Sequence, residues 1–280
     1  ASDVYKRQVL LVTTKKGKTE KPTISYTGNF NFNTPASVPQ KVNVLQHIEM
    51  MGELYANDGI SNHFFTHLLP YVNTADIYSK NPEVVKGPFG DTPDLVLGWH
   101  DWWKEMYGTA FDHSHNLSIS GGSEKSNYYA SIGYLDQGSM FNYGEHNNKK
   151  YWGRFKYEYN LNKYIKLRSN VYVGRKKVTE PYDINQLAWL TYWTWNCQPT
   201  FNPQGQYYGS GGFGNPIAFA EHTGNRWKTY YSYYTQLGFD ITPLKNLTIT
   251  GDMSLNYDIS HEKYYRKRHQ TYHWDGSLNY

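Results

Sequence analysis

The chain has 280 residues, a formal net charge of +4, an aromatic content of 18% and a mean hydropathy of −0.76. Its Lys and Arg residues are scattered, so no nucleic-acid interface is expected. Cys197 is the single cysteine, which excludes an internal disulfide and a multi-cysteine metal site. No stretch approaches the roughly 18 apolar residues that a transmembrane helix needs. A membrane β-barrel remains compatible with this composition, because its strands alternate apolar and polar residues.

The N-terminal part of the sequence predicts two strands after a non-native segment. Residues 1–8, ASDVYKRQ, are interpreted as a non-native scar. Residues 9–14, VLLVTT, form a short apolar run that predicts a buried strand, followed by the basic turn KKGK. Residues 23–33 then place Ile24, Tyr26, Phe30 and Phe32 opposite a row of Thr, Ser and Asn. This period of two predicts a strand with one apolar and one polar face.

Residues 34–113 lose the period of two. Within them, residues 42–57 follow a helical period, which predicts one short helix in this stretch. An excursion of this length between two strands exceeds ordinary loops, and such long loops are frequently functional.

Alternation returns after Asp112 and predicts a series of long strands. The alternating runs are 117–119, 128–134, 151–160, 164–174, 230–242 and 246–259. Most soluble strands have about 5–6 residues, whereas a tilted strand needs about 9–11 to cross a bilayer. The expected connections alternate between tight turns (GGSEKS, NLNK, TPLKN) and long loops at 34–113, 137–149 and 178–228. Short turns at one end and long loops at the other are typical of outer-membrane barrels.

The polar face of the later strands is charged, and two environments account for it. In a barrel this face lines a wet lumen, and in a soluble sandwich it meets solvent. Strand length and loop asymmetry favour the barrel. The predicted lumen-facing residues are Arg154, Lys156, Glu158, Lys166 and Arg168.

Two sequence blocks resemble a known family. VLLVTTKKGK at 9–18 followed by KPTISYTGNF at 21–30 is similar to the plug-to-barrel junction of SusC/RagA-type TonB-dependent outer-membrane transporters. WHDWWKEMYGTAFDHSHNLSISGGSEKSNYYASIGYLDQGSM at 99–140 is similar to the next block of that family. ASDVYKRQ departs from the family pattern, which has a Gly-rich segment before the apolar strand.

The resemblance implies an all-β fold, namely part of an antiparallel transmembrane β-barrel with long extracellular loops. Residues 9–18 would be the last strand of the plug and residues 19–280 about the first seven or eight strands of a barrel of about 22. It further implies TonB-driven import of oligosaccharides or peptides across the outer membrane of a Gram-negative bacterium. The implied partners are a SusD-like surface lipoprotein, TonB and outer-membrane lipid.

Catalytic and metal-binding chemistry is not expected. His113 and His115 have no evident third ligand. Asp252 and Asp258 share a strand face, but alternation alone places polar residues there. The stretch HEKYYRKRHQTYH at 261–273 is interpreted as a strand end that enters a solvated loop; contact with anionic lipopolysaccharide or substrate is the alternative. No enzyme activity and no cofactor are predicted.

Loop aromatics are the candidate ligand contacts, because aromatic rings stack on the apolar faces of sugars. They crowd two long loops and comprise Trp99, Trp102, Trp103, Trp189, Tyr192, Trp193 and Trp195. The alternative is that they pack the loops together or join an interfacial aromatic girdle. A secreted soluble all-β glycan-binding module is the alternative function, and a passive porin is disfavoured by VLLVTTKKGK.

Overall fold

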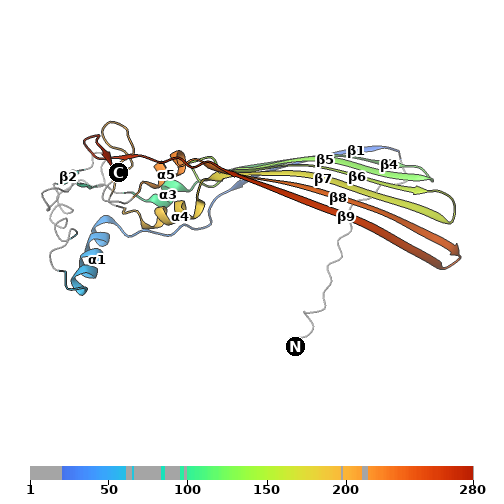
Figure 1. Cartoon of the computed structure of the whole chain (residues 1–280), viewed down its shortest axis with the longest axis horizontal. Helices are drawn as coiled ribbons and strands as arrows, with labels where there is room; N and C mark the ends of the chain where they lie inside the picture. The colour runs from blue at the N-terminus through green and yellow to red at the C-terminus, as the bar shows by residue number, and fades with distance from the viewer. Residues whose placement is uncertain are drawn as a thin grey trace, which may run out of the picture.

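The computed structural model describes residues 21–60, 65, 83–85, 95–97, 100–196, 198–209 and 214–279, without the side chains of 83–85 and 95–97. The predicted scar at 1–8, the predicted plug strand at 9–18, Trp99 and Cys197 lie outside the described residues. The described part consists of a long β-sheet at one end and a group of short helices and loops at the other (Figure 1).

Seven strands form one antiparallel sheet in the order β1-β4-β5-β6-β7-β8-β9. Their bounds are β1 (Thr23–Asn33), β4 (Ala110–Gly122), β5 (Ser126–Gln137), β6 (Asn147–Asn160), β7 (Ile165–Pro181), β8 (Asn225–Leu244) and β9 (Leu247–Tyr264). Two small pairs join β2 (Glu83–Val85) to β3 (Leu95–Leu97) and β10 (Thr271–Tyr272) to β11 (Leu278–Asn279). Within the described residues β1 and β9 do not pair, so the sheet is open. The predicted antiparallel strands, part of a larger barrel, are confirmed.

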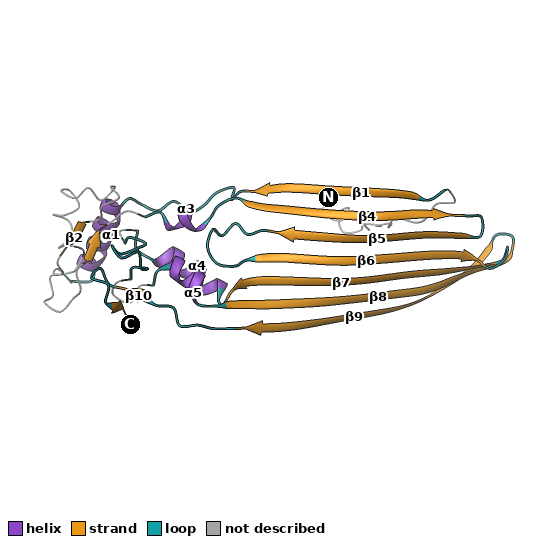
Figure 2. Cartoon of the chain, turned by 90° about the horizontal axis from the view of Figure 1, so that it is seen from above, coloured by secondary structure: helices purple, strands orange, loops and turns teal. Residues whose placement is uncertain are grey.

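The two ends of the sheet carry connections of different length (Figure 2). The turn end consists of residues 123–125, 161–164 and 245–246. The loop end consists of residues 34–109, 138–146 and 182–224 and the segment after β9. In the tightest turn Asn246 has a φ of 79°, a left-handed conformation that Asn adopts more readily than most residues. The predicted alternation of tight turns and long loops is confirmed.

The six strands from β4 to β9 are all longer than the alternating runs in the sequence. β7, β8 and β9 have 17, 20 and 18 residues and continue beyond the apolar alternation at the loop end. The added segments 175–181 and 225–229 carry polar residues on both faces, with Val178 and Trp227 as exceptions, so their sequence shows no apolar period of two. Backbone pairing between Pro181 and Asn225 and between Arg226 and Tyr264 keeps them extended.

Each strand has one apolar and one polar face, and the register aligns these faces across the sheet. The apolar face carries the even-numbered residues of β1 and β5 and the odd-numbered residues of the other five strands. One row of paired residues on it runs Ile24, Ile119, Ala130, Phe155, Val171, Thr235 and Leu255. The opposite side is the polar face.

Four described helices lie at the loop end, where the sequence predicts one. They are α1 (Val44–Asn57), α3 (Trp102–Met106), α4 (Ile184–Trp193) and α5 (Pro216–His222). Each begins after an Asn or Asp whose side-chain oxygen accepts a backbone N–H of the first turn, and these caps are Asn43, Asp101, Asp183 and Asn215. The helix predicted over 42–57 is confirmed as α1. No described helix is both long and apolar enough to cross a membrane.

Among the described residues, a cluster of buried hydrophobic side chains lies between α3, α4 and α5. Its buried residues are Trp102, Met106, Leu187, Leu190, Ile217, Phe219 and Ala220. We call this group the helical cluster. α4 escapes the sequence analysis because aromatic residues also cover its outer side, which hides the helical period.

Candidate functional site

The polar face brings the five predicted lumen residues together. Arg154, Lys156 and Glu158 lie on β6, and Lys166 and Arg168 lie on β7. The register pairs Glu158 with Arg168, so all five share the polar face. That this face lines a lumen remains a prediction.

Neighbouring charges on the polar face are matched. Lys166 Nζ lies 2.6 Å from Glu158 Oε2, and Arg168 Nη2 lies 3.0 Å from Asp240 Oδ1 and 3.2 Å from Asp252 Oδ2. The Arg154 guanidinium stacks 5.2 Å from the Tyr172 ring centroid. These side chains are partly exposed, so the pairs stabilise a hydrated wall only modestly.

A second ionic network lies on the polar face at the loop end, and sequence reasoning missed it. Arg226 Nε lies 3.1 Å from Glu180 Oε1 and 2.8 Å from Glu262 Oε1, and Lys228 Nζ lies 3.3 Å from Glu180 Oε1. These residues belong to the polar extensions of β7, β8 and β9. In the sequence these residues stand out only as charges of both signs in separate segments, and only the pairing of the three strands brings them together.

Large side chains of the apolar face are exposed on several strands. Ile24, Phe32 and Leu255 expose 70%, 75% and 68% of their surface. On β8 an uncharged part of the apolar face extends from Tyr231 to Ile241, a length of about 33 Å at about 3.3 Å per residue. At the strand tilt of barrels this corresponds to about 25 Å of height, which matches the apolar band of an outer-membrane barrel.

The loop aromatics separate into buried and exposed groups. Trp102 is only 1% exposed, lies in the helical cluster and donates from Nε1 to the Trp195 carbonyl oxygen at 2.9 Å. Trp103 is half-buried and stacks on Tyr107 with ring centroids 5.4 Å apart. Trp195 packs against Phe65, with ring centroids 4.8 Å apart. In this structure Trp102 and Trp195 serve loop packing, the alternative that the sequence left open.

Three residues of α4 form an exposed aromatic patch. Trp189, Tyr192 and Trp193 expose 50%, 62% and 53% of their surface. The Trp189 and Trp193 ring centroids are 5.7 Å apart, and those of Tyr192 and Trp193 are 5.9 Å apart. Of the described candidates, these three are the ones with large exposed rings, and their contact with a ligand remains a prediction.

A polar cavity of about 820 Å³ opens beside the same helix. Asp183 and Gln186 of α4 line one side, and the basic segment after β9 lines the other with Arg266, Lys267 and Arg268. The sequence interpretation of 261–273 as a strand end entering a loop is confirmed, because β9 ends at Tyr264.

Burial shifts the pKa of several loop groups. It lowers the pKa of His146 and His269 below 6.5, and the cations His222 and Arg266 lower the pKa of His269 further. Burial raises the pKa of Tyr207, whose hydroxyl donates to Glu221. Among the described residues no group of three or more His, Cys, Asp or Glu side chains is arranged to hold a metal ion.

Comparisons with known proteins find a similar receptor sequence and solved structures of similar fold. No family model matches the chain. The chain is 26% identical over 267 residues to "TonB-dependent receptor P26" of Formosa agariphila, covering 90% of this chain and 23% of that protein. It superposes with a TM-score of 0.65 on the RagAB peptide importer in the "closed-closed" state, at 20% identity, covering 91% of this chain and 30% of that one. The "open-open" state gives a TM-score of 0.61. Together with the two sequence blocks, these likenesses support the resemblance of the chain to a stretch of a SusC/RagA-type TonB-dependent receptor, and the solved structures show that it shares their fold.

Proposed function

We propose that this stretch forms wall and extracellular loops of an outer-membrane importer driven by TonB. The observation that carries the proposal is the two-faced sheet, with an apolar face of bilayer height, tight turns at one end and long loops at the other. A water-soluble module would cover its apolar face, and among the described residues no second sheet does so. The likeness to a TonB-dependent receptor and to an importer supports the same conclusion.

We further propose that the imported substrate is an oligosaccharide that the exposed aromatic patch receives. Asp183, Gln186, Trp189 and Trp193 follow one another at helical spacing, so the polar cavity and the patch lie along one side of α4. Aromatic rings supply stacking area, and the cavity supplies hydrogen-bonding groups, a combination that suits a sugar chain. The solved structures of similar fold are of a peptide importer, so a peptide is the competing substrate.

The proposal includes two protein partners. A SusD-like surface lipoprotein would cover the loop end, and TonB would act from the opposite side of the membrane. The family resemblance and the solved RagAB assemblies support the lipoprotein partner. Co-purification of the complete receptor with a lipoprotein, from cells that express both at native level, tests it.

Membrane fractionation of the complete receptor tests the proposed location. We expect it in the outer-membrane fraction, with uptake of a fluorescent oligosaccharide that stops when TonB is deleted. A receptor that is soluble without detergent would refute the importer and favour the secreted glycan-binding module.

A titration of oligosaccharides and peptides tests the substrate. Trp193→Ala should weaken sugar binding by about tenfold, the worth of one lost stacking contact. The matched control is Tyr164→Ala, because Tyr164 is similarly exposed at 47% but lies at the turn end. Binding of peptides with no binding of sugars would refute the oligosaccharide assignment and leave the importer standing.

A further inference from the structure

Charged side chains on the apolar face occur only near the loop end. Within the seven described strands, this face carries four Lys or Arg residues and one acid, namely Lys149, Arg175, Lys177, Lys263 and Asp136. The part of the face toward the turn end carries none. The apolar face is therefore cationic at one edge only.

Three of these cations, Arg175, Lys177 and Lys263, have no acidic partner among the described residues. Lys149 Nζ lies 3.4 Å from Asp136 Oδ2, which compensates its charge. Arg175 and Lys177 are two residues apart on β7, and no described carboxylate pairs with either. Unpaired cations beside hydrocarbon are costly unless an anion meets them.

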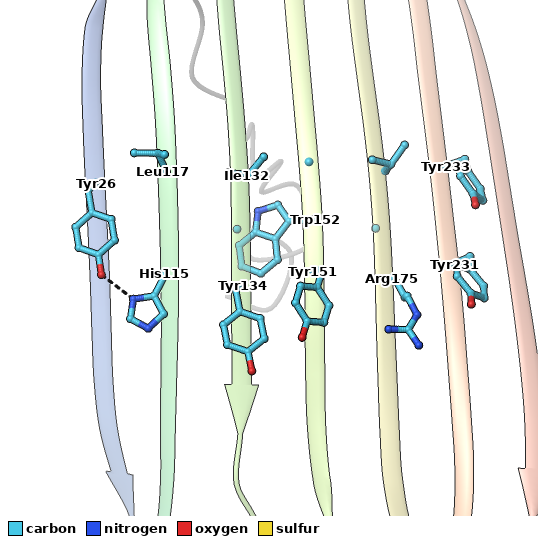
Figure 3. A pocket seen from close by; sticks show the side chains of 14 residues that line it. Tyr26, His115, Leu117, Ile132, Tyr134, Tyr151, Trp152, Arg175, Tyr231 and Tyr233 are labelled. Carbon is cyan, nitrogen blue, oxygen red and sulfur yellow. Dashed lines mark hydrogen bonds between the residues drawn. The ribbon is translucent and has the colours of Figure 1, made fainter.

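A groove of about 650 Å³ crosses the apolar face directly beside Arg175 (Figure 3). Its floor is low where Ile132, Gly153 and Val173 lie side by side, because Gly153 has no side chain. A Cβ built on Gly153 would lie 3.6 Å from its nearest neighbour, Val173 Cγ2, which is an ordinary van der Waals contact, so a side chain fits there without a clash at its Cβ. Tyr26 and Tyr233 stand at the two ends of the groove.

The groove continues along the strands, away from the cations. A second hollow of about 530 Å³ shares Leu117, Ile132, Gly153 and Val173 with the first and extends to Phe155 and Val171. The side chains that face it from the apolar face are hydrocarbon. Together the two hollows provide an apolar channel that has its cationic edge at the loop end.

We propose that this groove binds a phosphorylated, multiply acylated glycolipid of the outer leaflet, with its phosphates at Arg175 and Lys177 and its acyl chains in the hollows. The assignment rests on the proposed function, because it requires the apolar face to meet the bilayer with the loop end outside. Arg175 offers the forked donor set that suits phosphate. Figure 3 shows the Tyr134 and Tyr151 hydroxyls pointing toward the same end of the sheet as the Arg175 guanidinium.

The width of the groove favours a lipid with several chains over a two-chain phospholipid. Its lining comes from six adjacent strands, β1 and β4 to β8. At about 4.8 Å between strands this spans about 24 Å, which is several times the width of one acyl chain. Two adjacent cations without acidic partners likewise suit a headgroup with more than one phosphate charge.

Native mass spectrometry of the complete receptor, purified from outer membranes in nonionic detergent, tests the site with lipid A and phosphatidylglycerol as probes. We expect lipid A to be retained, and its affinity to fall about 30-fold in R175Q/K177Q. Gly153→Leu should lower the affinity about tenfold at unchanged charge, because its side chain occupies the place of about two methylene groups. The matched control K125Q/K163Q removes two cations from the tight turns and should change nothing.

Each other outcome has a defined meaning. Unchanged lipid A retention in R175Q/K177Q, or equally strong retention of phosphatidylglycerol, overturns the inference. Heat-dependent gel migration verifies that each variant is inserted and folded. A folded, inserted receptor that retains no lipid A refutes the inference alone, whereas a receptor absent from the outer membrane refutes the proposed function together with it.

Discussion

Replacing Trp102 by alanine removes the largest of the fully buried side chains and tests what holds the loop end together. Trp102 is 1% exposed and belongs to the helical cluster with Met106, Leu187 and Ile217. Its ring also stacks on His100, with centroids 5.0 Å apart. The substitution therefore leaves a cavity between α3 and α4.

The expected destabilisation follows from this burial. Truncation of a buried Trp to Ala costs about 3–5 kcal/mol when the surroundings cannot collapse into the space. The substitution also leaves the Trp195 carbonyl oxygen without its donor, a bond of 2.9 Å in this structure. A local loss of about 4 kcal/mol corresponds to an opening equilibrium nearly 1000-fold more favourable.

Hydrogen exchange followed by mass spectrometry measures this local opening. The reporters are amides of α4, such as that of Leu187, which donates to the Asp183 carbonyl at 3.0 Å. Trp102→Ala should speed their exchange by at least about 100-fold and leave strand amides unchanged. The matched control is Trp193→Ala, where 53% of the side chain is exposed and exchange should change by less than about tenfold.

Equal exchange in the Trp102 and Trp193 variants would refute the assignment of Trp102 to packing. Loss of sugar binding by Trp102→Ala without faster exchange would return Trp102 to the ligand-contacting group. A change that spreads into β6 and β7 would show that the loop end and the sheet unfold as one unit.

Three further predictions concern the sheet and the loops. Arg168→Gln removes the ion pairs to Asp240 and Asp252. Because all three side chains are partly exposed, the free energy of unfolding in detergent should fall by only about 1–2 kcal/mol. A loss above about 4 kcal/mol would contradict this prediction. Asn246 has a φ of 79°, so Asn246→Val should lower the free energy of unfolding by about 1–2 kcal/mol, whereas Asn246→Gly should not lower it. Equal losses in the two variants would contradict the argument from backbone strain. Burial holds the pKa of three loop histidines, His47, His146 and His269, below 6.5, so the unfolded loops bind more protons than the folded loops as the pH falls from about 6.5 toward the lowered values. The loops should therefore be fully stable above pH 6.5 and less stable below it, and hydrogen exchange of loop amides, corrected for the intrinsic rate, should be faster at acid pH. Loop protection that does not change with pH would contradict this prediction.

The sequence alone predicted the position of a strand wherever one face of the strand is apolar and the other is polar. Within 128–134 and 151–160 apolar and polar residues alternate, because each pleat sends successive side chains to opposite faces. The tight turns were equally visible, since Ser, Asn, Gly and Lys interrupt the alternation. The sequence also predicted that Arg154 and Arg168 lie on the same face, because both occupy even-numbered positions of alternating runs, and the register confirms this.

The ends of β7, β8 and β9 were not predictable, because polar residues on both faces carry no period. The ion pair from Arg168 to Asp252 joins residues 84 positions apart, and only the register of three strands makes them neighbours. The groove over Gly153 has the same origin, since it depends on which side chains flank that glycine in adjacent strands.

The loop tryptophans show the same division at the level of single residues. Trp102 and Trp193 are the same residue type and each has an aromatic neighbour in the sequence, yet Trp102 is 1% exposed and Trp193 is 53% exposed. Composition determined that these loops would be aromatic. Which rings are buried was decided by the packing of α3, α4 and α5, because burial depends on contacts between segments that are far apart in the chain.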